Sequence, residues 1–258
     1  MLAAALFVVL FGCPHAQAKD GSAGKRPVPF QIGERLDYSL KWGFIPVGVA
    51  VFEVLDGSSV TGIPSYLFRL TVRSHPVIDL IYKVRDHIES YVDRSMTHSL
   101  LYRKKQQEGR HKRDIEVRFD WKRSRAYRYN KGRYETRVDV PAGTFDPLGV
   151  FYAFRLNPIS DGLVVETPVT DGKKAVIATA RVVRREPVSL HKKTFDTYLV
   201  EPDLKHVGGV FEKSKDAKLQ VWVTADFRRI VVALKSKVVV GHFSGELTSA
   251  PGLAPSRP

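Results

Sequence analysis

Apolar and polar residues alternate with a period of two along most of this chain, and this pattern constrains the fold more than any other feature. In residues 36–42 the apolar side chains occupy the even positions, and in residues 115–121 they occupy the odd positions. Successive side chains of a strand point to opposite faces of a sheet, so each such segment predicts a strand with one buried face.

Turn signals rich in Gly, Asn, Asp and Pro separate many segments of this kind. Strands are expected at residues 36–42, 49–55, 66–73, 84–92, 99–107, 115–121, 134–140, 163–169, 175–184, 195–200, 218–224, 230–235 and 238–247. A chain of 258 residues is ordinary for one all-β unit. We therefore predict a mainly β protein with a single domain over residues 30–248, a flexible lead-in at 19–29 and a flexible tail at 249–258.

One segment breaks the strand rhythm and predicts an amphipathic helix over about residues 146–156. Asp146 is an N-cap candidate, and Pro147 suits the first helical position. Leu148, Phe151 and Leu156 recur at helical spacing before Asn157-Pro158 ends the pattern. The apolar face of this helix predicts that it packs on a sheet or plugs it. Residues 75–83 are ambiguous between a helix and a strand, and a short helix is favoured.

The N-terminal residues predict export. A continuous apolar run from Leu2 to Phe11 is shorter than the ~20 residues that span a bilayer, and Ala16-Gln17-Ala18 offers a small-x-small cleavage site. We expect residues 1–18 to be a signal peptide and the mature chain to lie in the periplasm, without a transmembrane segment. The single cysteine, Cys13, loosely fits a lipidation site, but cleavage after Ala18 is favoured. Cleavage there leaves no cysteine for disulfides or thiol chemistry.

Motifs for catalysis, cofactors or metals are weak. His87 and Glu89 form an H-x-E pair without the cysteines that a zinc deaminase needs, no G-x-S-x-G is present, and Gly208-Gly209 has no phosphate-loop context. We expect no cofactor and no metal, and we assign no catalytic residue. Asp146, Asp226 and Glu89 are the acids left for paired-carboxylate hydrolysis. A helix N-cap explains Asp146 far better than catalysis does, and a hairpin turn accounts for Asp226.

Positive charge is concentrated in one region. The formal net charge is +14, and residues 103–137 contain fourteen Lys and Arg but five Asp and Glu. Such a ribbon suits anionic ligands, although strand edges also carry Lys and Arg that prevent edge-to-edge pairing. Predicted export disfavours nucleic acid and leaves anionic lipid, lipopolysaccharide, acidic polysaccharide or an acidic protein. The binding candidates are Arg118, Lys122, Arg123, Arg125, Arg128, Lys131 and Arg133.

Five segments in order resemble the bacterial exported domain-of-unknown-function family 3108 over about residues 30–248. They are IGERLDYSLKWGFIPVGVAVFEV (32–54), DHIESYVD (86–93), FDPLGVFYAFR (145–155), VTDGKK (169–174) and LQVWVTADFRRIVVALKSKVVVGHFSGEL (219–247). Ile230 departs from the family, which often has a proline there. The residues that carry most of the resemblance are Gly33, Glu34, Trp42, Gly43, Asp146, Arg155, Trp222 and Asp226.

The resemblance implies an envelope location and a β-rich domain, and the family has no agreed activity. An antiparallel sheet curled around one helix, or a partly open barrel, would look like the half-barrel carriers of lipids and lipoproteins. We therefore expect non-enzymatic binding or carriage of an amphiphilic or anionic envelope component. The alternatives are an envelope polysaccharide hydrolase that uses paired carboxylates, and a scaffold that binds an acidic protein partner.

Overall fold

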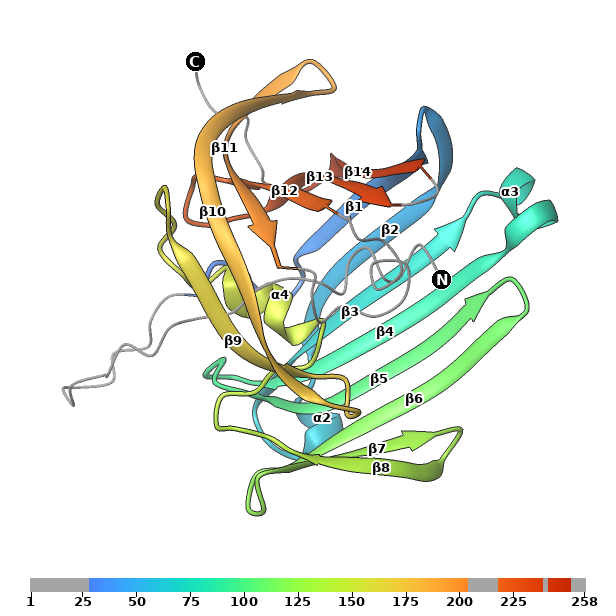
Figure 1. Cartoon of the computed structure of the whole chain (residues 1–258), viewed down its shortest axis with the longest axis vertical. Coiled ribbons are helices and arrows are strands. Elements are labelled where there is room, and N and C mark those ends of the chain that lie inside the picture. Colours follow the sequence, from blue (N-terminus) through green and yellow to red (C-terminus); the bar gives the residue numbers. More distant parts are fainter. Residues whose placement is uncertain (1–27, 204–217, 239–240, 252–258) are drawn as a thin grey trace.

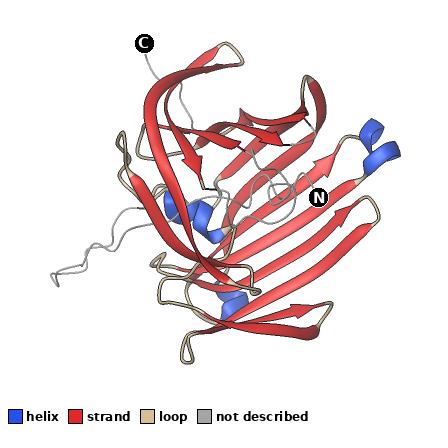
Figure 2. Cartoon of the chain, in the orientation of Figure 1, coloured by secondary structure: helices blue, strands red, loops and turns tan. Residues whose placement is uncertain are grey.

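The structure is a computed structural model that describes residues 28–203, 218–238 and 241–251 (Figure 1). The predicted signal peptide with Cys13, nearly all of the lead-in and tail, and Gly208-Gly209 lie outside the described residues. Strands dominate the fold (Figure 2). They are β1 (Arg35–Trp42), β2 (Ile45–Asp56), β3 (Ser65–Ser74), β4 (Val84–Asp93), β5 (Ser99–Glu108), β6 (His111–Asp120), β7 (Arg125–Asn130), β8 (Arg133–Asp139), β9 (Val164–Thr170), β10 (Ala175–Leu190), β11 (Lys193–Pro202), β12 (Lys218–Thr224), β13 (Val231–Val238) and β14 (Gly241–Ser249).

All of these strands belong to one antiparallel sheet with the order β8-β7-β6-β5-β4-β3-β2-β1-β14-β13-β12-β11-β10-β9. Neighbours in the sheet are neighbours in the chain except at β1 and β14, which pair with Tyr38 opposite Leu247. The fold is therefore two meanders joined through the first and last strands. This arrangement confirms the predicted mainly β fold with a curled antiparallel sheet.

The sheet curls until its two ends meet through side chains. Arg128 on β7 donates a hydrogen bond from Nη1 to the carbonyl oxygen of Asp171 in the β9–β10 turn, at 2.6 Å. Gly172 in the same turn lies so close to β6 that an added Cβ would be 2.9 Å from a methyl carbon of Val117. Phe145, which follows β8, forms an isolated parallel bridge with Val169 on β9. These contacts bring the two ends of the curled sheet together, although β8 and β9 do not pair through a continuous ladder of backbone hydrogen bonds.

Helix α4 (Gly149–Phe154) lies against the inner face of the curled sheet (Figure 1). The Tyr152 ring stacks on Phe68 with the ring centroids 3.7 Å apart, and the Phe151 ring stacks on Phe52 at 5.0 Å. All six helical residues are buried, so the helix is enclosed on every side instead of exposing a polar face as predicted. It is also shorter than the predicted 146–156, because Asp146-Pro147-Leu148 forms the approach to the first turn.

Two further helices occupy connections between strands. Helix α2 (Ser58–Thr61) lies in the connection between the strands expected at 49–55 and 66–73, and α3 (Pro76–Tyr82) confirms the helical reading of residues 75–83. Among the described residues, no helix combines the length and the apolar composition needed to cross a membrane.

Candidate anion-binding site

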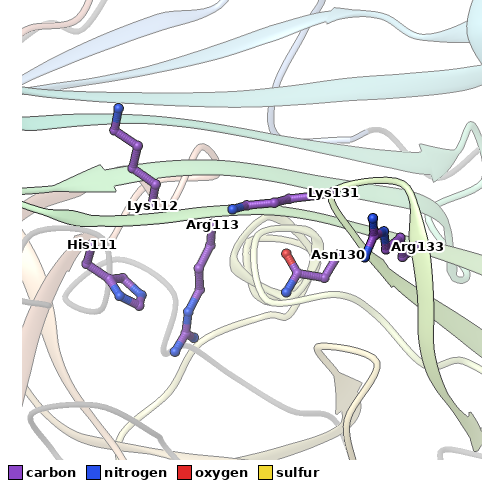
Figure 3. A pocket seen from close by; sticks show the side chains of 6 residues that line it. All are labelled: His111, Lys112, Arg113, Asn130, Lys131 and Arg133. Carbon is purple, nitrogen blue, oxygen red and sulfur yellow. The ribbon is translucent and has the colours of Figure 1, made fainter.

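A pocket of about 630 Å³ lies where β6 begins and where β7 turns into β8. Four of its six lining residues are Lys or Arg, and no carboxylate is among them (Figure 3). The lining residues, which we call the basic pocket, are His111, Lys112, Arg113, Asn130, Lys131 and Arg133.

The hairpin between β7 and β8 brings the two halves of the basic pocket together. Lys131 and Gly132 form its two-residue turn with φ values of 51° and 74°, which is the conformation that glycine adopts most easily. The Lys131 backbone N–H donates to the carbonyl oxygen of Asp114 on β6 at 2.7 Å, which fixes this turn beside the first residues of β6. In Figure 3 the side chains of His111, Arg113 and Asn130 point to one side of the ribbon and Lys112 points to the other.

The electrostatics of the basic pocket favour an anion. Lys112, Arg113, Lys131 and Arg133 are all exposed, and no carboxylate of the described ranges forms an ion pair with them. Burial lowers the pKa of Lys104 on the adjacent strand. The negative charges of Asp86 and Glu108 oppose this lowering, and the positive charge of Arg113 adds to it. Several exposed positive charges thus border one solvent-open volume, although Lys112 points to the other side of the ribbon.

Of the seven predicted binding residues, Lys131 and Arg133 lie in the basic pocket, and most of the others are paired with carboxylates elsewhere. Arg118 donates to Glu116 at 2.6 Å, Arg123 to Asp120 at 2.8 Å and Arg125 to Asp139 at 3.0 Å. Lys122 is exposed in the β6–β7 turn, at the opposite end of these strands. The structure therefore does not gather the predicted ribbon into one site.

Arg128 corrects the expectation of an exposed ribbon, because its side chain is only 4% exposed. It lies opposite Val117 on the inward face of β7. Its Nε donates to Glu135 at 2.5 Å, and its Nη1 donates to the Asp171 carbonyl described above. Arg128 therefore closes the curled sheet and does not face solvent.

Half of the residues that carried the family resemblance form a structural network around α4. Arg155 is 1% exposed and forms a two-pronged ion pair with Glu34, with N–O distances of 2.5 and 2.9 Å. Its remaining N–H groups donate to the carbonyl oxygens of Arg228 and Pro29. Asp226 accepts hydrogen bonds from Thr224 and from the backbone of Arg228, which shapes the turn that supplies one of these carbonyls.

Asp146 ties α4 to two strands. Its carboxylate accepts hydrogen bonds from Ser90 on β4 at 2.5 Å and Ser99 on β5 at 2.6 Å, and from the backbone N–H groups of Leu148 and Gly149. Burial raises the pKa of Asp146, although these four hydrogen bonds oppose that effect. The side chain thus accepts hydrogen bonds from two backbone N–H groups at the start of α4, but the helix begins at Gly149 and its N-cap residue is Leu148, not Asp146 as predicted.

The remaining motif residues also make internal contacts. Gly33 donates its N–H to the Val54 carbonyl at 2.8 Å, and Gly43 donates to the His242 carbonyl at 2.9 Å. The Trp42 ring stacks on Phe243, with the ring centroids 6.1 Å apart. The Trp222 indole donates to Glu186 at 2.6 Å.

The three acids considered for hydrolysis occupy separate surroundings. Asp146 is enclosed under α4, Asp226 lies in the β12–β13 turn, and Glu89 contacts His87 and Arg69 on β4 and β3. None of the three shares a hydrogen-bond partner with another. His87 meets Glu89 at 3.2 Å, and the described residues contain no cluster of three or more His, Cys, Asp or Glu that suits a metal ion.

Sequence reasoning missed a neighbouring pair of acids on the inner face. Asp86 on β4 and Glu108 on β5 are both 1% exposed. Burial, followed by the negative charge of Glu108, raises the pKa of Asp86 to about 6. The register places Asp86 opposite Gln106 and Glu108 opposite Val84, so the two acids are diagonal neighbours. No motif marks them, because their proximity depends on the pairing of two strands.

The comparisons with known proteins agree with this fold. The chain belongs to the protein family of unknown function DUF3108, whose family model matches residues 37–248. It is similar in structure to a beta-barrel-like protein of the domain of unknown function DUF1849 from Brucella abortus, with a TM-score of 0.53 and 13% sequence identity. That match covers 85% of this chain and 97% of the other. No curated protein shows significant sequence similarity to the chain.

Proposed function

We propose that the protein is exported to the periplasm and there binds an anionic amphiphile of the cell envelope without changing it chemically. The observation that carries this proposal is the basic pocket, in which cationic side chains surround a volume of about 630 Å³ with no carboxylate in the lining. The apolar run from Leu2 to Phe11 and the Ala16-Gln17-Ala18 sequence support export.

The chemistry of the pocket selects the ligand. Arg, Lys and the imidazole of His donate hydrogen bonds to phosphate or carboxylate oxygens, and charge assistance makes such bonds about twice as strong as neutral ones. Arg113 is followed on the same face of β6 by Ile115 and Val117, which are buried. These two side chains lie in the core and do not line the pocket. The pocket itself therefore recognises the anionic group of the ligand.

A soluble anionic lipid tests the pocket in solution. Calorimetric titration with monomeric dihexanoyl phosphatidylglycerol should show binding that weakens at least ~10-fold in an Arg113→Glu/Lys131→Glu variant, since two charge-assisted contacts become repulsive. The matched control is Lys122→Glu/Arg123→Glu, which makes the same change of charge at the other end of β6. Equal weakening in both variants would show that net charge alone drives binding, and the pocket would be rejected.

Native mass spectrometry of the protein purified from its own periplasm, followed by organic extraction, distinguishes the sources of the anion. A co-purified phospholipid or lipopolysaccharide fragment supports carriage of a lipid, and an acidic polysaccharide moves the assignment to sugar. A protein that carries no co-purified ligand and does not bind the soluble lipid would favour the alternative function, a scaffold that binds an acidic protein partner.

A further inference from the structure

Apolar side chains are exposed at the same end of the sheet as the basic pocket. This end, which we call the rim, comprises the β1–β2 turn, α3, the β5–β6 turn and the β7–β8 turn (Figure 1). Phe44 in the β1–β2 turn is 100% exposed, and its neighbour Ile45 is 60% exposed. On α3, Leu80 and Ile81 are 86% and 87% exposed. Large apolar residues at such exposure are costly in water unless a surface covers them.

Helix α3 is turned with its apolar side outward. Val77, Leu80 and Ile81 are spaced so that they share one helical face, and all three are exposed. Asp79 on the other side receives hydrogen bonds from Ser74 and Arg85. A helix at the surface of a globular protein normally buries its apolar face and exposes its charges, so the reversed orientation of α3 needs an explanation outside the isolated chain.

Backbone contacts make the rim continuous. The His75 N–H at the start of α3 donates to the Val47 carbonyl beside the β1–β2 turn at 3.0 Å. At the end of α3 the Lys83 carbonyl accepts from Gly109 in the β5–β6 turn at 2.7 Å, and Gly109 lies against the Tyr82 ring. Through β6 and the hydrogen bond between Lys131 and Asp114, the same edge reaches the basic pocket. The exposed apolar residues and the unpaired cations therefore belong to one connected edge.

The charge of this edge is positive. Lys83 and Arg110 are exposed between α3 and the basic pocket. The basic pocket contributes four further exposed cations, Lys112, Arg113, Lys131 and Arg133. The acidic residue of α3, Asp79, is already held by Arg85. Hydrogen bonds from Arg85 and Ser74 keep the pKa of Asp79 below its usual range, so this residue stays in its ion pair at neutral pH.

We propose that the rim docks on an anionic membrane surface. Phe44, Ile45 and the exposed face of α3 enter the headgroup region, and the cations of the β5–β6 turn and the basic pocket contact lipid phosphates. The β1–β2 turn and α3 form two apolar tips with cations beside them. A membrane surface with anionic headgroups above an apolar interior suits both features. This docking shares the basic pocket with the proposed function, but the apolar tips do not depend on any ligand in that pocket.

Vesicle flotation tests the docking with the protein as it is purified from its host. The vesicles are equimolar phosphatidylglycerol and phosphatidylcholine, with pure phosphatidylcholine as the neutral comparison. We expect binding to the anionic vesicles that falls on the order of 10-fold in a Phe44→Ser/Leu80→Ser/Ile81→Ser variant and also falls as salt is raised. The matched control, Val60→Ser/Ile63→Ser/Phe227→Ser, removes exposed apolar residues from outside the rim and should bind as the wild type does.

Each outcome of this experiment supports or overturns the docking. Wild-type binding by the rim variant, or equal losses in the rim and control variants, would overturn it. A wild-type dimer in sedimentation velocity that the rim variant converts to a monomer would instead make the rim an interface between two copies. The soluble lipid titration keeps the two proposals apart, because the rim variant should bind monomeric dihexanoyl phosphatidylglycerol normally. If that titration fails while flotation still depends on the tips, only the proposed function is lost.

Discussion

Arg155 places a full positive charge in the interior, and its surroundings offset the cost of burying it. Its guanidinium is paired with Glu34 on two N–H groups and donates to two backbone carbonyls, so four polar atoms receive the charge. Burial opposes the charged form, but the hydrogen bonds and charge of Glu34 raise the pKa of Arg155 above its ordinary value. These contacts join the segment before β1, the end of α4 and the β12–β13 turn. One side chain therefore links three distant parts of the chain.

Removing this guanidinium should destabilise the fold strongly. An Arg155→Met substitution leaves the Glu34 carboxylate without its partner in a buried site, so the free energy of unfolding should fall by about 3–5 kcal/mol. Urea denaturation measures this change. The control is the double variant Glu34→Gln/Arg155→Met, which removes both charges and should regain part of the loss. If the double variant is no more stable than the single one, an uncompensated Glu34 charge is not the cause.

At the scale of elements, the β9–β10 turn is the point where the curled sheet meets itself. Gly172 in this turn has a φ of 85°, and a Cβ there would be 2.9 Å from both Val117 and Arg128. Gly132 in the β7–β8 turn has a similar φ of 74° but no atom within 4 Å of an added Cβ. Both glycines have a positive φ, but only at Gly172 would an added Cβ collide with another strand.

Substituting both glycines separates these two effects. Gly132→Ala should lower the free energy of unfolding by about 1 kcal/mol, because only the left-handed conformation is penalised. Gly172→Ala should lower it by about 2–4 kcal/mol, since the turn must also move away from β6. Thermal and urea unfolding of the two variants give the comparison. Equal losses would mean that the β9–β10 turn does not press on β6.

The strands were predictable where alternation is strong and were not predictable where polar residues run together. Residues 36–42 lie within β1 and residues 115–120 within β6, because one buried face imposes a period of two. The first four residues of β6, His111 to Asp114, are all polar and show no alternation, so the prediction began the strand at 115. The pairing with β5 extends the strand across this stretch.

That missed stretch explains why only two of the six lining residues of the basic pocket were predicted as binding residues. Lys131 and Arg133 follow from a recognisable turn, whereas His111 and Arg113 belong to the part of β6 that alternation did not mark. Arg128 was misplaced for a related reason, because its partner Asp171 is 43 residues away in the sequence. Short-range sequence patterns predict individual strands, but they do not predict which distant strands come into contact when a sheet curls.

At the scale of the whole molecule, a single long sheet keeps a curled shape because its ends are fastened to each other. The β1–β14 pairing joins the two meanders at one place, and Arg128 with Gly172 joins their free ends at another. The basic pocket lies on β6, β7 and the β7–β8 turn, next to the second junction. All of its lining residues come from β6, β7, this turn and the start of β8, and the second junction contacts β6 and β7 at Val117 and Arg128. We therefore expect that loosening the junction affects the strands that carry the pocket.

Hydrogen exchange should reveal this dependence. An Arg128→Met substitution removes the hydrogen bond to the Asp171 carbonyl and the ion pair with Glu135, so amide exchange should accelerate in β7–β8 and also in the β9–β10 turn. The control, Arg125→Met on the same strand, loses its pairing with Asp139 on β8 and its interaction with Tyr127 on β7, so it should change β7–β8 alone. If Arg128→Met leaves the β9–β10 turn unchanged, the two ends of the sheet are held independently. Faster exchange at both ends, together with weaker binding of the soluble lipid, would mean that the junction supports the basic pocket.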